Sequence, residues 1–316
     1  MSARSPWAGA RRRGRLAALP ALAAVLASCG LGPGNTPKNV TLTVTNDFGA
    51  HVVLQTSTPS ISGSETVMQL LQRNDRVTTR YGGGFVESIA GLSGNAGGAQ
   101  PIDWFYYVNG VEAPAGAAAT NLNAGDRVWW DRHDWSVTDD VPAVVGSFPE
   151  PFLNGIGGKR YPVTVYCAVP TSAACHTVGN RLGALGITVT FGALGTDEPD
   201  TLRVLVGTYE QLRIDPAAVY LEEGTQASGV YARFPANGAT IALLDPQGKV
   251  VRTLGAGAGL VAADAIPHEV PTWLVIGTTA TGVQAAANAF NAPTLRNRFA
   301  VAVGPGGTVP VPVTGA

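Results

Sequence analysis

The feature that most constrains the fold is an aromatic strand that runs into an Asn-Gly turn. Trp104–Val108 holds four consecutive aromatic residues, which fit a pleated and half-buried sheet. Asn109 and Gly110 follow directly, and this dipeptide is the strongest short-range signal for a two-residue β-hairpin. A further strand is expected at Arg127–Trp135, after a turn at Asn121–Asp126. We therefore expect this part of the chain to build an antiparallel sheet.

The residues before this hairpin predict two strands and a helix. Val40–Val44 alternates apolar and polar side chains, and a second strand is expected at His51–Leu54. Apolar residues then recur at helical spacing through Val67–Leu71. Two strands, a helix and further strands in this order indicate a β-grasp-like domain, a curved sheet packed on one helix. We expect this domain to span residues 39–138.

The same region resembles the carboxy-terminal β domain of the transcobalamin family, in the version found on bacterial surface lipoproteins. The motifs that carry the resemblance are Thr66–Leu71, Trp104–Gly110 and Leu122–Trp130, within roughly residues 39–135. In the vitamin-binding relatives this domain covers one face of a cobalamin, and a separate helical domain covers the other face. The resemblance implies cobalamin or another corrinoid as the ligand class, although no such helical domain is predicted here.

The second half of the chain has a different pattern. Residues 139–159 are rich in Pro and Gly and are expected to be a linker. Residues 160–303 alternate strands and helices, which predicts an α/β domain and makes the whole chain α+β. Val204–Thr208 and Leu274–Thr278 are similar, so an internal duplication is predicted, with a glycine that either admits a ligand or permits a tight turn. Residues 304–316 are expected to be disordered.

The amino terminus has the layout of a secretory signal peptide. Positions 11–15 hold four arginines, and the apolar run Leu16–Ala27 is too short to span a bilayer of about 30 Å. No later apolar stretch reaches the length of a transmembrane helix. We therefore expect residues 1–28 to be removed as a signal.

Cys29 follows the small residues of Leu26–Ser28, and this motif resembles the lipobox of bacterial lipoproteins. The resemblance implies a diacylglycerol on the Cys29 thiol and a fatty acyl group such as palmitate on the new amino terminus. An ordinary cleavage site is the alternative. With two or more acyl chains, the protein would be stably anchored at the extracytoplasmic face of the cell membrane. Residues 29–38 would then be a flexible tether.

The other two cysteines, Cys167 and Cys175, are eight positions apart. Disulfides persist outside the cytosol, so we expect these two residues to pair, with free thiols as the alternative. A structural metal site would need more ligands at closer spacing. Removing the five arginines of the signal from the 21 basic residues leaves 16, against 22 acidic residues. This acidic balance argues against a nucleic-acid partner.

Four aromatic residues are candidates for a ligand-binding surface. Trp104, Tyr106, Trp129 and Trp135 lie in or beside predicted strands, and a stack of such rings suits a planar or sugar-like ligand. The alternative is that these rings form the core of the sheet. Because side chains alternate along a strand, Trp104 and Tyr106 share one face and only one set of aromatics can line a site.

The sequence predicts no catalytic or metal site. Asp131 and His133 share a face of an extended strand, but no third metal ligand is evident, so a solvated strand end is expected. No nucleophile elbow or zinc-protease motif is present. We therefore expect a non-enzymatic, lipid-anchored protein that binds a small molecule, in the corrinoid class by resemblance, for delivery to a membrane importer. The alternative is a structural or adhesion module that binds cell-wall polymer or another envelope protein.

Overall fold

The computed structural model describes residues 39–315, apart from residues 59–63, 96, 98, 99, 197 and 266–269. The predicted signal peptide, Cys29 and its tether lie outside the described residues. Within the described part of the chain, no helix combines the length and the apolar character that crossing a membrane requires. The described residues form four sheets and several helices, and more of them lie in strands than in helices. The predicted α+β class is therefore confirmed.

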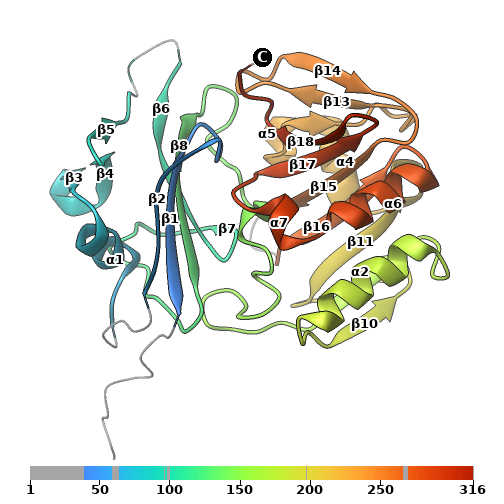
Figure 1. Cartoon of the computed structure of the whole chain (residues 1–316), viewed down its shortest axis with the longest axis horizontal. Coiled ribbons are helices and arrows are strands. Elements are labelled where there is room, and N and C mark those ends of the chain that lie inside the picture. The colour runs from blue at the N-terminus through green and yellow to red at the C-terminus, as the bar shows by residue number, and fades with distance from the viewer. Residues whose placement is uncertain are drawn as a thin grey trace, which may run out of the picture. The chain divides into compact units, whose positions relative to one another are not determined.

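The first sheet has the strand order β2-β1-β8-β6-β7 (Figure 1). Its strands are β1 (Val40–Asn46), β2 (His51–Thr58), β6 (Ile102–Val108), β7 (Val111–Glu112) and β8 (Arg127–Asp134). The central strands β1 and β8 run parallel, whereas the other neighbours are antiparallel. This order, with one helix after the first hairpin, is the predicted β-grasp arrangement.

The predicted hairpin and helix form as their local signals indicate. Asn109 and Gly110 both have positive φ, 56° and 79°, which a type I′ turn requires. Helix α1 (Val67–Asn74) begins with a capping box, in which Thr66 accepts from the Gln69 backbone and Gln69 accepts from the Thr66 backbone. The apolar residues of α1 are buried against the sheet.

A small sheet follows α1 and borders the first sheet. It contains β3 (Val77–Arg80), β4 (Phe85–Ile89) and β5 (Leu92–Ser93), with the 3-10 turn η1 (Tyr81–Gly83) between β3 and β4. Ile89 is fully buried, but Phe85 is 37% exposed and Tyr81 is 86% exposed. Two large aromatic side chains therefore remain at the surface on this sheet.

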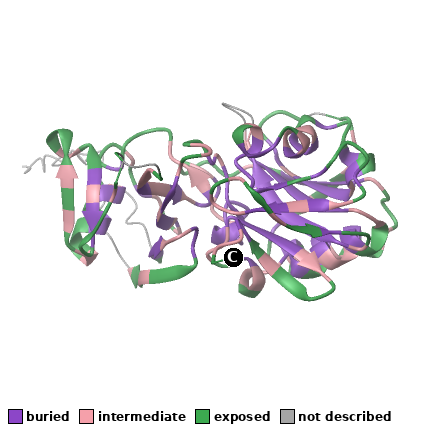
Figure 2. Ribbon diagram, turned by 90° about the horizontal axis from the view of Figure 1, so that it is seen from above, coloured by how far each residue is buried: buried purple, intermediate pink, exposed green. Residues whose placement is uncertain are grey.

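The largest sheet has the strand order β10-β9-β11-β16-β15-β17-β18. Its strands are β9 (Val163–Cys167), β10 (Val189–Gly192), β11 (Leu202–Thr208), β15 (Gly259–Asp264), β16 (Thr272–Gly277), β17 (Ala300–Gly304) and β18 (Gly307–Val311). The four strands from β10 to β16 in this order are parallel, and the remaining neighbours are antiparallel. The central strands are buried along most of their length (Figure 2).

The two faces of this sheet are covered differently. Helices α2 (Ala173–Ala184) and α6 (Ala280–Ala289) lie side by side on one face, where Arg181 donates to the Ala287 carbonyl. The other face packs on α3 (Tyr209–Leu212), α4 (Pro216–Glu223), α5 (Thr225–Ser228) and the sheet of β12 (Ala232–Arg233), β13 (Ile241–Leu244) and β14 (Val250–Leu254).

Residues 139–159 are not the exposed linker that their composition predicts. Val144 and Val145, at the start of the 3-10 turn η2 (Val145–Ser147), are fully buried in two different core clusters. Phe148 and Phe152 pack on Trp273 at centroid distances of 5.9 and 5.0 Å. The Pro and Gly residues determine the backbone path of this segment. They do not keep it exposed, because burying its apolar side chains is favourable. It is therefore an integral part of the core.

The predicted disorder after residue 303 is also wrong for the described residues. Strand β18 pairs along β17, and Val311 is buried against the core. The pairing satisfies backbone groups at the edge of the sheet, which composition alone does not reveal.

The two similar segments of the predicted duplication lie in the adjacent strands β11 and β16, which pair in parallel, and each strand leads into a helix. A Cβ on Gly207 would lie 2.8 Å from the Ala168 Cβ, and one on Gly277 would lie 2.3 Å from the Val283 nitrogen. This close packing favours the tight-turn explanation for the glycines. The duplication itself stays a prediction.

The predicted disulfide is confirmed. Cys167 at the end of β9 is bonded to Cys175 in the first turn of α2, with the Cα atoms 5.9 Å apart. The bond joins a central strand to the helix that follows it.

Candidate functional site

The four aromatic residues predicted as a ligand-binding set do not form one surface. Trp104 and Tyr106 on β6 pack with the α1 side of the five-stranded sheet. Trp129 on β8 belongs to the core cluster on the opposite side. Trp135, just beyond β8, is half-buried and its backbone donates to the Pro101 carbonyl. The alternation of the strands therefore separates Trp129 from the Trp104 and Tyr106 pair.

Trp104 and Tyr106 line a groove of about 190 Å³ on the α1 side of the sheet. Its lining includes Phe85, Trp104, Tyr106, Glu112, Ala117 and Trp130, and we call it the aromatic groove. The rings of Tyr106 and Trp130 stack with centroids 4.7 Å apart and an interplanar angle of 25°. Phe105 also lines the groove, so most of its larger side chains are aromatic.

Hydrogen bonds hold the walls of the aromatic groove in place. The Tyr106 hydroxyl is within 2.8 Å of the Thr120 hydroxyl and also donates to the Ala115 carbonyl. The Trp104 indole nitrogen donates to the Leu92 carbonyl at 3.1 Å. By contrast, the buried indole N–H of Trp130 has no acceptor in the described part of the chain. Burial raises the pKa of Tyr106, so its hydroxyl stays protonated at neutral pH.

The rim of the aromatic groove is extended by exposed rings that sequence reasoning missed. Phe85 lines the groove. The Tyr81 ring contacts the Phe85 ring edge-on, with the two centroids 6.2 Å apart. Tyr81 has a positive φ of 53° and precedes two glycines with positive φ. The Gly82-Gly83-Gly84 run was the available signal, because glycines at such a turn allow an adjacent aromatic residue to project outward.

Glu112 borders the groove but its carboxylate is engaged elsewhere. Its Oε2 atom accepts a hydrogen bond from the Val141 backbone at 3.1 Å. Burial, together with the nearby charge of Asp140, raises the pKa of Glu112 to about 8. The protonated form of Glu112 is therefore favoured on the border of the groove.

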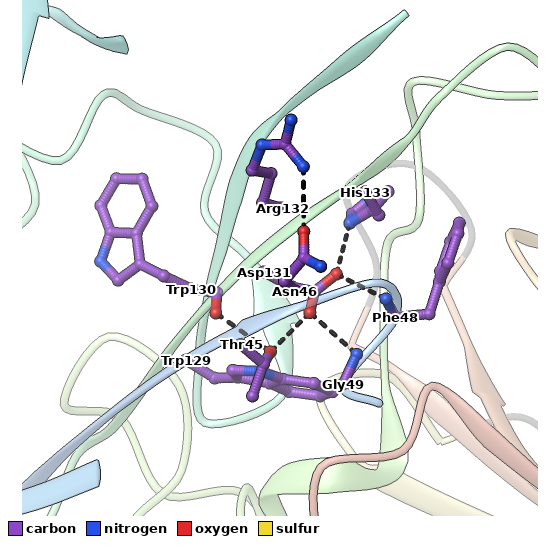
Figure 3. A network of polar contacts seen from close by, with 9 residues as sticks. All are labelled: Thr45, Asn46, Phe48, Gly49, Trp129, Trp130, Asp131, Arg132 and His133. Carbon is purple, nitrogen blue, oxygen red and sulfur yellow. Dashed lines mark hydrogen bonds and ion pairs between the residues drawn. The ribbon is translucent and has the colours of Figure 1, made fainter. Parts of the chain in front are cut away.

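A buried polar network lies on the opposite side of the sheet (Figure 3). The Asp131 carboxylate accepts from the backbones of Phe48 and Gly49, at 3.0 and 2.8 Å, and from the Thr45 hydroxyl. The Nδ1 atom of His133 hydrogen-bonds to Asp131 at 2.9 Å. The predicted solvated strand end is wrong, because Asp131 is fully buried and His133 is 3% exposed.

This network anchors the turn between β1 and β2. The Thr45 hydroxyl donates to Asp131 and lies 3.3 Å from the Trp130 carbonyl, and it accepts from the Trp129 indole at 2.6 Å. The His133 ring is enclosed by Phe48 and Phe105 at centroid distances of 4.6 and 4.5 Å. No group of three side chains suited to hold a metal occurs among the described residues. The His133 ring is thus packed among aromatic side chains and held by Asp131, which is a structural arrangement.

Further cavities open elsewhere in the molecule. One, of about 420 Å³, lies on the Trp129 side of the five-stranded sheet and contains Arg127 and Arg296; we call it the arginine cleft. Another, of about 450 Å³, lies at the carboxyl ends of β11 and β16, beside the first residues of α2 and α6. Such strand ends are a common ligand position in α/β sheets.

A comparison with protein families matches a segment in the first half of the chain. Residues 64–134 match a family described as a domain of unknown function (DUF4430). No curated protein matches the chain.

Similar solved structures include a candidate metal-binding protein from Ruminococcus gnavus, which is 14% identical with a TM-score of 0.25. That match covers 31% of this chain and 97% of the other. Haptocorrin in complex with Cbi is also 14% identical, with a TM-score of 0.26, and the match covers 35% of this chain and 28% of haptocorrin. At these scores neither likeness bears on the ligand or the mechanism.

Proposed function

We propose that the chain is a non-enzymatic, extracytoplasmic binding protein that takes a small molecule with a flat or ring-shaped part into the aromatic groove. The stack of Tyr106 on Trp130 in an open groove is the observation that carries the proposal. Aromatic faces bind flat ligands over a large apolar area, and concave sites of this kind are the usual location of small-molecule binding.

The ligand class in this proposal is a corrinoid, which the sequence resemblance to the transcobalamin β domain supports. A groove of about 190 Å³ is smaller than the usual drug-sized pocket of about 300–1,000 Å³. A corrinoid would therefore enter only along one edge, and the rest of its ring would lie on Phe85 and Tyr81 at the rim. One-sided contact of this kind predicts modest affinity and rapid release, which suits delivery to a membrane importer.

Isothermal titration of the full-length protein in detergent with cobalamin and with cobinamide tests the ligand. Phe85→Ala and Tyr81→Ala alter exposed rings and should leave the fold intact, while weakening binding by about ten-fold for Phe85, or about 1.4 kcal/mol. Phe191→Ala is the matched control, because Phe191 is a similarly exposed ring on β10. Absence of binding by both corrinoids at tens of micromolar, with the protein folded, would remove the corrinoid version.

Lipid anchoring at Cys29 is the second part of the proposal. The motif around Cys29 supports it, and a Cys29→Ala variant should move the mature protein from the membrane fraction to the soluble fraction. Mass spectrometry of the native N-terminal peptide is the direct measurement. A bare thiol at Cys29, or a variant that stays with the membrane, would contradict anchoring without affecting the proposed groove.

A structural or adhesion role is the second candidate, and the exposed Tyr81–Phe85 pair favours it. Exposed aromatic side chains often anchor interfaces with other macromolecules. Co-sedimentation with purified cell-wall polymer should then be strong for the unmodified protein and weak for Tyr81→Ala. This result, combined with no detectable corrinoid binding in the titrations, would favour a structural or adhesion role over small-molecule delivery.

A further inference from the structure

The arginine cleft is built on the face of the five-stranded sheet that lies opposite the aromatic groove. Strand register places polar residues of three neighbouring strands side by side, because Thr41 pairs with Ser57 and with Arg127, and Thr43 pairs with Gln55. All five of these residues line the cavity of about 420 Å³. One wall of the cleft is therefore a patch of hydroxyl and amide groups with a guanidinium at its side.

The opposite wall comes from distant parts of the sequence. Ser147 of η2 and Arg296 with Asn297, just beyond helix α7 (Ala292–Leu295), line this side. The Asn297 backbone donates to the Gly146 carbonyl at 3.3 Å. A Cβ on Gly49 would lie only 2.0 Å from the Asn297 carbonyl oxygen, so the β1–β2 turn packs directly against this wall. The cleft is thus a preformed gap between fixed segments.

The side chains that line the arginine cleft carry positive charge and no negative charge. Its lining holds Arg127 and Arg296 and includes no Asp or Glu. Within the described residues neither arginine forms an ion pair, although Arg127 donates one hydrogen bond to the Phe148 carbonyl at 3.1 Å. Two guanidinium groups facing a common cavity are therefore left with free donors.

Electrostatic surroundings agree with this geometry. Burial lowers the pKa of Arg127; Glu150 acts in the opposite direction, and the like charge of Arg296 lowers it further. Glu150 does not neutralise Arg127 by direct contact, because its carboxylate accepts from the Asn154 backbone and side chain, at 2.8 and 2.6 Å. The two arginines thus repel one another across the cleft until an anion lies between them.

We propose that the arginine cleft binds the phosphate group of a small phosphorylated polyol. Guanidinium groups bind oxyanions through paired hydrogen bonds, and a phosphate offers enough oxygens to satisfy two of them at once, whereas a carboxylate is satisfied by one. The hydroxyls of Thr41, Thr43 and Ser57 and the amide of Gln55 then face the polyol hydroxyls. This site is separate from the aromatic groove and does not depend on the function proposed for it.

Isothermal titration of the full-length protein with glycerol phosphate, inorganic phosphate and glycerol tests the proposal. We expect glycerol phosphate to bind, inorganic phosphate to bind more weakly, and glycerol to give no signal. Arg296→Gln changes an exposed side chain and should weaken binding by at least about ten-fold, as loss of a charge-assisted hydrogen bond predicts. Arg298→Gln, two positions away and outside the lining, is the matched control and should bind as the unmodified protein does.

The outcomes are separable. Equal affinity for glycerol phosphate and inorganic phosphate would overturn the polyol part and leave an oxyanion site. Equal losses in Arg296→Gln and Arg298→Gln would reduce the effect to general surface charge and overturn the site. Thr43→Val, which removes a hydroxyl at constant volume, should weaken glycerol phosphate and leave inorganic phosphate unchanged. Phe85→Ala should change neither affinity, which keeps this test independent of the aromatic groove.

Discussion

The two faces of the five-stranded sheet carry different chemistry although the same strands build both. The face that carries Tyr106 and Trp130 is closed by α1 and the small sheet, and it leaves an aromatic groove. The face that carries Arg127 and Trp129 is partly closed by Phe299 of the C-terminal region, and it leaves a polar cleft. Because successive side chains of β6 and β8 point to opposite faces of the sheet, a different set of side chains lines each cavity.

The aromatic rings on the two sides of the sheet also differ in what they contact. On the Trp129 side the Phe299 ring contacts Phe48, Tyr107, Trp129 and His133 at centroid distances between 5.0 and 5.7 Å. On the other side the rim rings Tyr81 and Phe85 contact mainly each other. One aromatic cluster thus holds the two large sheets together, while the other is open to a ligand.

Asp131→Ala should produce the largest loss of stability and should act on the buried face. It leaves the Phe48 and Gly49 backbone donors and the Thr45 hydroxyl without their acceptor, at a cost of about 3–5 kcal/mol. Chemical denaturation measures the change, with exposed Asp139→Ala as the control. A loss below about 1 kcal/mol would mean that the network does not anchor the turn between β1 and β2.

Glu112→Gln should stabilise the protein in a pH-dependent way, because the folded-state pKa of Glu112 is raised to about 8 from an ordinary value of 4.5. Between these values the unfolded chain releases the proton first, so the stability of the unmodified protein falls as the pH rises. The advantage of the variant should grow across that window to at most about 5 kcal/mol.

Denaturant midpoints across this pH range test the Glu112 prediction. Asp140→Asn, which removes a charge that raises the pKa of Glu112, should give a smaller gain of the same sign. A pH-independent difference between Glu112→Gln and the unmodified protein would contradict the assignment.

Removing the disulfide should destabilise the largest sheet and leave both cavities of the first sheet unchanged. The bond closes a loop between positions eight apart, so the double variant Cys167→Ala, Cys175→Ala should lose about 2.5 kcal/mol. Thermal unfolding measures the loss, and the ligand titrations measure the cavities. Weaker binding at the groove or cleft in the folded double variant would show that the sheets are coupled.

Tyr106→Phe should have the smallest effect on stability, about 1 kcal/mol, because it removes the hydroxyl contacts to Thr120 and the Ala115 carbonyl and keeps the stacked ring. Tyr81→Phe removes a solvent-exposed hydroxyl and is the control. Corrinoid binding should persist in Tyr106→Phe. If this variant abolished binding while remaining folded, the hydroxyl rather than the ring face would be the recognition group.

Local signals in the sequence predicted much of the first sheet and several elements of the second. The Asn109–Gly110 turn and the Cys167–Cys175 pair depend on short spacings, so both could be recognised without tertiary information. The alternation of strands and helices predicted for residues 160–303 likewise follows from local apolar patterns. Alternation along β6 also predicted that Trp104 and Tyr106 would share a face.

The rest depended on contacts between distant residues. The sequence predicted that Asp131 and His133 would lie at a solvated strand end. No neighbouring residue in the sequence indicates that distant parts of the chain enclose them, namely the turn at Phe48 and Gly49 and the ring of Phe299. Strand β18 could not be predicted from its own residues, because it forms by pairing with β17. The arginine cleft likewise joins Arg127 to Arg296, which lie far apart in sequence.

The central claim is that a small molecule binds in the aromatic groove, and hydrogen–deuterium exchange with and without cobinamide tests it most directly. The proposal predicts slower exchange at the two groove-lining segments, residues 84–86 and 113–117, and unchanged exchange along β1 and β2. Protection confined to β1 and β2 or to the largest sheet, or no protection at saturating cobinamide, would contradict the account.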